Sequence, residues 1–229
     1  LPAGLTLSSD GIISGTPTAA TSQAAAFSVT ATIGEGISSA SSSRTFAINV
    51  LAGTPDISIT SDSGTYTYGD TITISGSIAA STTPPASNGI NAITELAQNQ
   101  VGLYLDDTQL ATASVGDDGA FTLTYDTSDK GITPGETAQT LTVRYGGSSN
   151  LNSGTATVQI TLKPKSIEAK FNGPLTKVYD GTTDAPTDLK LKLYDVLTGD
   201  DVSVTCNSIT FDTAAVGNNR LITATGISL

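Results

Sequence analysis

Hydrophobic and polar residues alternate along most of the chain. Runs such as 27–33, 121–125, 141–145 and 202–206 carry an apolar residue at every second position, with Thr, Ser, Arg or another residue between them. When apolar residues recur at every second position, one side of the strand faces a core and the other faces water, as in sheets that pack face to face. The pattern therefore predicts an all-β protein built from two-sheet sandwiches.

Turn sequences and one exception to the alternation refine this prediction. The turn at 116–119, which contains Asp117-Asp118-Gly119, lies between the alternating stretches 110–115 and 121–125, so we expect a β-hairpin there. The segment 90–100 instead has helical spacing, because its apolar residues recur every three to four positions. We expect about three helical turns over one end of a sandwich.

The alternation of apolar and polar residues is interrupted at two places, which divide the chain into three segments. One strand ends near residue 52 before a Gly-Thr-Pro sequence, and another runs into Lys163-Pro164, where proline blocks ladder pairing. We therefore expect modules at 1–52, 53–163 with an insertion at 79–100, and 164–229. The outer two are shorter than the roughly 100 residues of a complete sandwich, so we expect incomplete modules there.

The composition limits the chemistry. The chain has 229 residues, with no His, Met or Trp and a single Cys, which excludes His-based triads, His-containing zinc sites and intrachain disulfides. Thr and Ser together fill 64 positions, and Thr suits the solvated face of a strand because it is β-branched and polar. The net charge of -11 argues against nucleic acid, and no apolar run is long enough for membrane insertion.

Specific residues carry a resemblance to known families. The opening residues Leu1-Pro2-Ala3-Gly4-Leu5, followed by Asp10-Gly11-Ile12-Ile13-Ser14-Gly15-Thr16-Pro17, resemble the putative-Ig repeat of bacterial surface proteins. Tyr68-Gly69-Asp70-Thr71-Ile72, with Leu141 to Leu151, is similar to the bacterial Ig-like repeats of large adhesins, apart from the inserted segment. Lys177-Val178-Tyr179-Asp180-Gly181-Thr182-Thr183 resembles the YDG module.

These resemblances imply tandem immunoglobulin-like β-sandwich modules in an elongated array, within a secreted or wall-attached bacterial protein. The implied function is a non-catalytic stalk or spacer whose partners are neighbouring modules of the same chain. Two alternatives stay open. One is a ligand-binding adhesin module for carbohydrate or for host or matrix proteins, and the other is an accessory region of an extracellular polysaccharide-active enzyme.

A ligand surface is expected in two places. Tyr66 and Tyr68 share the parity of one strand and could offer aromatic rings to a sugar. The insertion adds a loop beyond the basic repeat, and loops concentrate functional residues. Its candidate contact residues are Ile90, Asn91 and Glu95.

Other reactive groups have structural explanations. The pairs Asp106-Asp107, Asp117-Asp118 and Asp200-Asp201 adjoin turns, where Asp is favoured, and we predict turn roles for them rather than catalysis. No segment has the spacing of a calcium loop. We expect no cofactor, although Asp56, Asp62 and Asp70 leave a convergent Ca²⁺ site open as an alternative.

Lysine and cysteine are the candidate nucleophiles. An isopeptide bond requires a Lys on an inward strand face, but alternation with apolar neighbours turns most strand lysines toward solvent. Lys177 is the one candidate whose side-chain direction the alternation does not determine. Cys206 shares the parity of Val202 and Val204, which predicts a small buried apolar residue rather than a reactive thiol.

Overall fold

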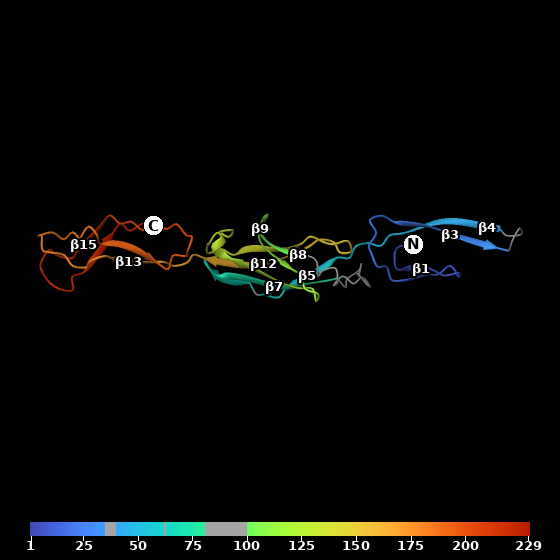
Figure 1. The fold of residues 1–229 in the computed structure, drawn as a ribbon, viewed down its shortest axis with the longest axis horizontal. Coiled ribbons are helices and arrows are strands. Elements are labelled where there is room, and N and C mark those ends of the chain that lie inside the picture. The colour runs from blue at the N-terminus through green and yellow to red at the C-terminus, as the bar shows by residue number, and fades with distance from the viewer. Residues whose placement is uncertain (35–39, 62, 81–99) are drawn as a thin grey trace. The chain divides into compact units, whose positions relative to one another are not determined.

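The computed structural model describes residues 1–34, 40–61, 63–80 and 100–229. Its regular elements are strands, and the described part of the chain contains one short 3-10 helix, η2 (Thr127–Asp129), and no α-helix (Figure 1). The all-β prediction is confirmed. Contacts group the chain into two compact units, Leu1–Lys163 and Pro164–Leu229, while the finer boundary expected near residue 52 stays a prediction.

The centre of the first unit is a two-sheet sandwich. One sheet has the strand order β10-β7-β5, and the other has the order β6-β12-β11-β8-β9. The strands are β5 (Pro55–Ile59), β6 (Gly64–Thr67), β7 (Thr71–Ala80), β8 (Gln100–Leu105), β9 (Thr108–Ser114), β10 (Ala120–Asp126), β11 (Gln139–Tyr145) and β12 (Gly154–Lys163). The segment 55–67 therefore contributes its first strand to one sheet and its second strand to the other.

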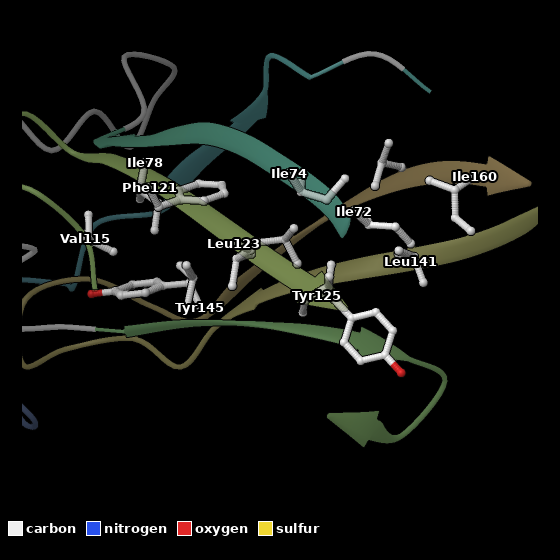
Figure 2. Close-up of a cluster of buried hydrophobic side chains, with 14 of the residues drawn as sticks. Ile72, Ile74, Ile78, Val115, Phe121, Leu123, Tyr125, Leu141, Tyr145 and Ile160 are labelled. Carbon is white, nitrogen blue, oxygen red and sulfur yellow. The ribbon is translucent and has the colours of Figure 1, made fainter. Parts of the chain in front are cut away.

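The core of the sandwich lies between the two sheets. Side chains of β7 and β10, such as Ile74 and Leu123, point toward those of the facing sheet, such as Leu141 and Ile160 (Figure 2). Among the described residues, seventeen buried hydrophobic side chains form this cluster, and all lie between Ile72 and Leu162. The alternation of β10 is strict, since its buried and exposed positions follow one another along the whole strand.

Hydroxyl side chains occupy the outer face, as the Thr and Ser content predicts. Ser58 and Ser77 lie 3.1 Å apart across β5 and β7. On the next pair of strands, the hydroxyls of Ser75 and Thr122 are 3.3 Å apart. Such cross-strand pairs stabilise a sheet while keeping its surface hydrated.

The prediction of a β-hairpin over residues 110–125 is wrong. The turn is present, because Gly119 donates its N–H to the Gly116 carbonyl at 2.9 Å and Gly116 donates to the Ala120 carbonyl at 2.8 Å. However, β9 pairs with β8, and β10 pairs with β7 in the opposite sheet. Each strand has a long partner elsewhere, so the turn links the two sheets instead of closing a hairpin.

The first 51 residues form two separate strand pairs. The strands β1 (Leu5–Leu7) and β2 (Ile13–Gly15) are antiparallel, as are β3 (Ala25–Ile33) and β4 (Ala40–Ile48). Pro2 is the only buried residue in the described part of this segment. Phe27 and Phe46 stack with ring centroids 5.9 Å apart, yet Phe46 remains 46% exposed. The alternation of β3 and β4 thus forms a strand pair without a closed core.

The second unit also consists of strand pairs. Here β13 (Glu168–Asn172) pairs with β14 (Lys190–Tyr194), and β15 (Ser208–Phe211) pairs with β16 (Ile222–Thr225). The strand expected over 202–206 is not formed, apart from an isolated bridge between Thr205 and Ser228. Because that segment lacks a regular partner strand, Val202 is exposed and Cys206 is only partly buried, contrary to the prediction of a buried cysteine.

Two further expectations concern helices. The predicted helical segment 90–100 lies outside the described residues except for Gln100, which begins β8. Within the described ranges, no helix has the length and apolar character needed to cross a bilayer.

Candidate functional site

The two tyrosines predicted to bind ligand lie at the start of the sandwich. Tyr66 is on β6, where it packs against the core, and its ring covers Gly64: a Cβ added there would be 3.0 Å from Tyr66 Cε2. Tyr68 follows β6, is partly buried, and donates its backbone N–H to the Lys163 carbonyl at 2.8 Å. A ligand role for the pair stays a prediction, and Ile90, Asn91 and Glu95 lie outside the described residues.

The strand that carries Tyr66 has a distinctive partner. The pairing of β6 with β12 is parallel, with Gly64 opposite Ile160 and Thr67 opposite Lys163. The other ladders of the sandwich strands in the described chain are antiparallel. The first strand of this sheet in the chain order is therefore paired, in the same direction, with the last.

A second feature joins the first segment to the sandwich. The side chain of Asn150 is buried, at 4% exposure, and its Oδ1 accepts the backbone N–H of Ala20 at 2.7 Å. Asn150 follows β11 in the loop that leads to β12, whereas Ala20 precedes β3. The structure therefore contains a hydrogen bond between segments that are 130 positions apart in the sequence.

The same loop holds the linker between these segments. Gly53 donates its N–H to the Asn150 carbonyl at 2.8 Å, and its own carbonyl accepts the N–H of Asn152 at 2.8 Å. Gly53 and Leu151 form a parallel bridge. The joint was not predicted from the sequence, because the Gly-Gly-Ser-Ser-Asn sequence at 146–150 indicates a turn but not what the turn contacts.

The YDG-like sequence of the second unit closes a compact polar turn. Lys177, whose side chain is 16% exposed, lies 2.7 Å from Asp180 Oδ1. Its Nζ also donates to Thr182 Oγ1 and the Asp184 carbonyl, each at 2.7 Å, and to the Thr182 carbonyl at 3.2 Å. The ammonium group of Lys177 therefore links the start of the segment 177–184 to its end by hydrogen bonds.

The carboxylate of this turn is strongly stabilised in its charged form. Hydrogen bonding to Lys177 and to the backbone N–H of Thr182 lowers the pKa of Asp180 to about 2. The Thr182 hydroxyl also donates to Asp180 Oδ1, at 3.0 Å. Lys177, which parity had left unplaced as an isopeptide nucleophile, is thus an ion-paired ammonium that donates to several oxygen atoms. That arrangement suits a structural turn and not a neutral amine nucleophile.

The acid pairs lie at turns, as their sequence context predicts. Asp106, at a left-handed φ of 52°, lies with Asp107 in the turn between β8 and β9, and Asp118 Oδ1 accepts the N–H of Ala120 at 3.0 Å. Asp200 follows a turn and donates its N–H to the Leu197 carbonyl. Within the part of the chain that the structure describes, no three acidic or cysteine side chains cluster in a way that could hold a metal ion. Asp62 of the open calcium alternative is outside that part.

The two ends of the chain match known domain families. Residues 1–51 match the model of the putative Ig domain, and residues 161–229 match that of the YDG domain. Each end of the chain is thus similar to one of these two families. These matches agree with the resemblances carried by 1–17 and 177–183 and confirm that this is a protein of tandem Ig-like modules.

Solved structures with weak similarity to this chain include surface-layer and titin fragments. Domains 4 to 9 of the surface-layer protein SbsC are 17% identical, with 97% of this chain and 33% of that chain covered and a TM-score of 0.31. A chimeric titin Z1Z2 fragment is 13% identical, with 49% of this chain and 98% of that chain covered and a TM-score of 0.29. The chain spans about a third of that SbsC fragment. No curated protein matches it.

Proposed function

We propose that this chain is a non-catalytic structural segment, acting as a spacer in a secreted or wall-attached bacterial surface protein and transmitting tension between its neighbours. The parallel pairing of β6 with β12 is the observation that carries the proposal. In this sandwich, β6 lies near the N-terminal side of the module and β12 ends at its C-terminal side.

The direction of the pair determines how it responds to load. Tension on the linker acts first on β5, which pairs with β7, and through β5 it pulls β6 toward its N-terminus. Tension on the far end pulls β12 toward its C-terminus. Because the strands are parallel, these two forces slide one strand along the other. The hydrogen bonds from Gly64–Ile160 to Thr67–Lys163 then share the load together instead of opening one by one.

The joint at Asn150 supports the same function. A spacer must pass tension from one module to the next, and the buried Asn150 to Ala20 hydrogen bond ties the first segment directly to the sandwich. Gly53 is held by the same loop. The net charge of -11 supports solubility for an exposed, hydroxyl-rich surface.

An extracellular location is part of the proposal. It rests on the putative Ig and YDG domains, which the surface-protein resemblance associates with exported bacterial proteins. The single cysteine means that the chain contains no internal disulfide to stabilise it. Partners of the spacer are expected to be neighbouring modules of the same protein.

Single-molecule pulling of the full chain, with handles at both ends, tests the proposal. Tyr68→Pro removes the N–H that donates to the Lys163 carbonyl, whereas Tyr68→Ala removes the ring but keeps that N–H. We expect the unfolding force of the sandwich to fall clearly for Tyr68→Pro and much less for Tyr68→Ala. Equal forces for the two variants would contradict a load-bearing β6–β12 pair.

A further inference from the structure

The outer face of the five-stranded sheet has a gap in its row of side chains. Thr155, Arg144, Gly102 and Thr112 are neighbours across β12, β11, β8 and β9, because each is registered opposite the next. Around this row lies an open hollow of about 750 Å³, lined by Gly102, Arg144, Thr112 and Thr155 among others. Ligand pockets commonly have volumes of about 300 to 1,000 Å³, so this hollow is large enough for a sugar residue.

Tyr104 and Arg144 form one wall of the hollow. The Arg144 guanidinium carbon lies 4.4 Å from the centroid of the Tyr104 ring, within the range of a cation–π contact. The Tyr104 hydroxyl donates to Gln109 Oε1 at 2.8 Å. These contacts hold the aromatic ring in place before any ligand arrives.

Gly102 is required by this arrangement. A Cβ added at Gly102 would lie 2.5 Å from Tyr104 Cε2, so any larger residue would displace the ring. Glycine inside a strand weakens the strand and often marks a close approach by a ligand or another group. Here the close group is the Tyr104 ring, which lies over Gly102 and so takes a defined place beside the hollow.

The rest of the lining carries several polar side chains and no unbalanced charge, beside the apolar Val101 and the ring of Tyr145. The positive charge of Arg144 is countered by Asp107, whose Oδ1 lies 3.3 Å from Arg144 Nη2, and the Asp106 carbonyl accepts from the same nitrogen. Gln100, Gln109, Thr112 and Thr155 add amide and hydroxyl groups that can both donate and accept. Such groups match the hydroxyls of a neutral sugar better than a charged ligand, which would meet a compensated site on an acidic protein.

We propose that this hollow binds a residue of a neutral polysaccharide. The ring of Tyr104 and the guanidinium of Arg144 supply a flat contact surface, while the Gln and Thr side chains bond to sugar hydroxyls. The site is centred on the outward-facing row of Thr155, Arg144, Gly102 and Thr112, with Val101 and Tyr145 of the buried cluster also in its lining. It does not depend on the mechanical role proposed above. It also differs from the Tyr66 and Tyr68 pair predicted from sequence.

The test is an NMR titration of the full ¹⁵N-labelled chain with four neutral probes and one acidic probe. The neutral probes are tetrasaccharides of glucose, mannose, galactose and N-acetylglucosamine, and the acidic probe is a tetragalacturonate. We expect at least one neutral probe to shift the amides of Gly102, Tyr104 and Thr112. Shifts by the acidic probe alone would overturn the ligand class, and no shifts in these amides with any probe would overturn the site.

Two variants localise the binding. Tyr104→Ala should abolish the shifts, and Thr112→Val, which keeps the shape of an exposed strand residue but removes one hydroxyl, should weaken affinity about tenfold, as expected for one hydrogen bond. Thr122→Ala, on the outer face of the opposite sheet, is the matched control and should bind like the unmodified chain. If Thr112→Val binds as tightly as that control, the proposed contact surface is wrong.

Discussion

The central sandwich and the YDG unit have similar alternating sequences but bury them very differently. In the described part of the sandwich, seventeen hydrophobic residues are buried in one cluster. In Pro164–Leu229, Leu189 is the only buried residue. Strands β13 and β14 also alternate, yet Phe171, Leu191 and Leu193 are only partly buried and Ala169 is exposed.

The difference lies in whether a second sheet faces the first. The strands β7 and β10 are opposed by a five-stranded sheet, so their apolar faces become dry. The pairs β13–β14 and β15–β16 are two-stranded sheets, and isolated two-stranded sheets have marginal stability in water. The YDG unit therefore relies more on local polar contacts, such as those of Lys177, than on a core.

The largest contrast is expected from removing one leucine on each side of this comparison. Leu123→Ala creates a cavity in the closed core and should destabilise the sandwich by about 2 to 5 kcal/mol. Leu191→Ala, at a partly buried position of β14, should cost only about 1 kcal/mol. Hydrogen exchange measured segment by segment by mass spectrometry on the full chain separates the two effects. Similar losses would contradict the difference in closure.

The joint should be less sensitive than the core. Asn150→Ala leaves the Ala20 N–H without its acceptor and should cost about 1 to 3 kcal/mol locally. Exchange of the Ala20 amide should speed up by about 10-fold to 100-fold, in keeping with that energy. Asn152→Ala is the control, because the Asn152 side chain is exposed and makes only a 3.4 Å bond to the Ala52 carbonyl. Unchanged Ala20 exchange in Asn150→Ala would show that this hydrogen bond does not hold the joint.

Acid should loosen the YDG turn, because its carboxylate is part of the ion pair. The folded pKa of Asp180, about 2, is below the ordinary value of 3.8, so the charged form favours the folded turn. This stabilisation is complete above about pH 4 and is lost as the pH falls toward 2. NMR titration of the Asp180 carboxyl carbon should give a midpoint near the low value. A midpoint near 3.8 would show that Lys177 and Thr182 do not stabilise the charged carboxylate.

The smallest effect is expected at a buried hydroxyl. Tyr145 is 2% exposed, and within the described residues its Oη has no hydrogen-bond partner. Tyr145→Phe should therefore leave the sandwich unchanged or stabilise it by about 1 kcal/mol, because a desolvated hydroxyl is removed. Thermal unfolding compared with Tyr125→Phe tests this. The Tyr125 hydroxyl accepts the Gly131 N–H at 2.7 Å, so its removal should destabilise.

The fold class was predictable because alternation is a local signal. Phe121, Leu123 and Tyr125 are buried as their parity requires. Strand pairing was not predictable from local signals: the turn at 116–119 fits a hairpin and an arch between sheets equally well, and the better partners of β9 and β10 lie far along the chain. Cys206 was misplaced for the same reason, since its neighbours lack a regular partner strand.

The candidate sites divide in the same way. Turn roles for the acid pairs follow from neighbouring Gly and Asp residues, so sequence was sufficient. The Asn150 joint and the hollow at Gly102 depend on residues brought together across strands and segments, for which the chain offers no local motif. A lone Gly between Val101 and Leu103 is the one sequence signal at the hollow, and it indicates only a special backbone position.

Pulling the unmodified full chain from both ends tests the central claim most directly. If the sandwich is the closed, shear-loaded module, the last unfolding event should occur at the highest force and release about 350 to 400 Å, the length of roughly 110 extended residues. The first segment and the YDG unit should yield earlier, at lower force, because neither has a closed core. If the unfolding event that releases roughly 110 residues came before the other events, the proposal that the sandwich bears the load would be contradicted.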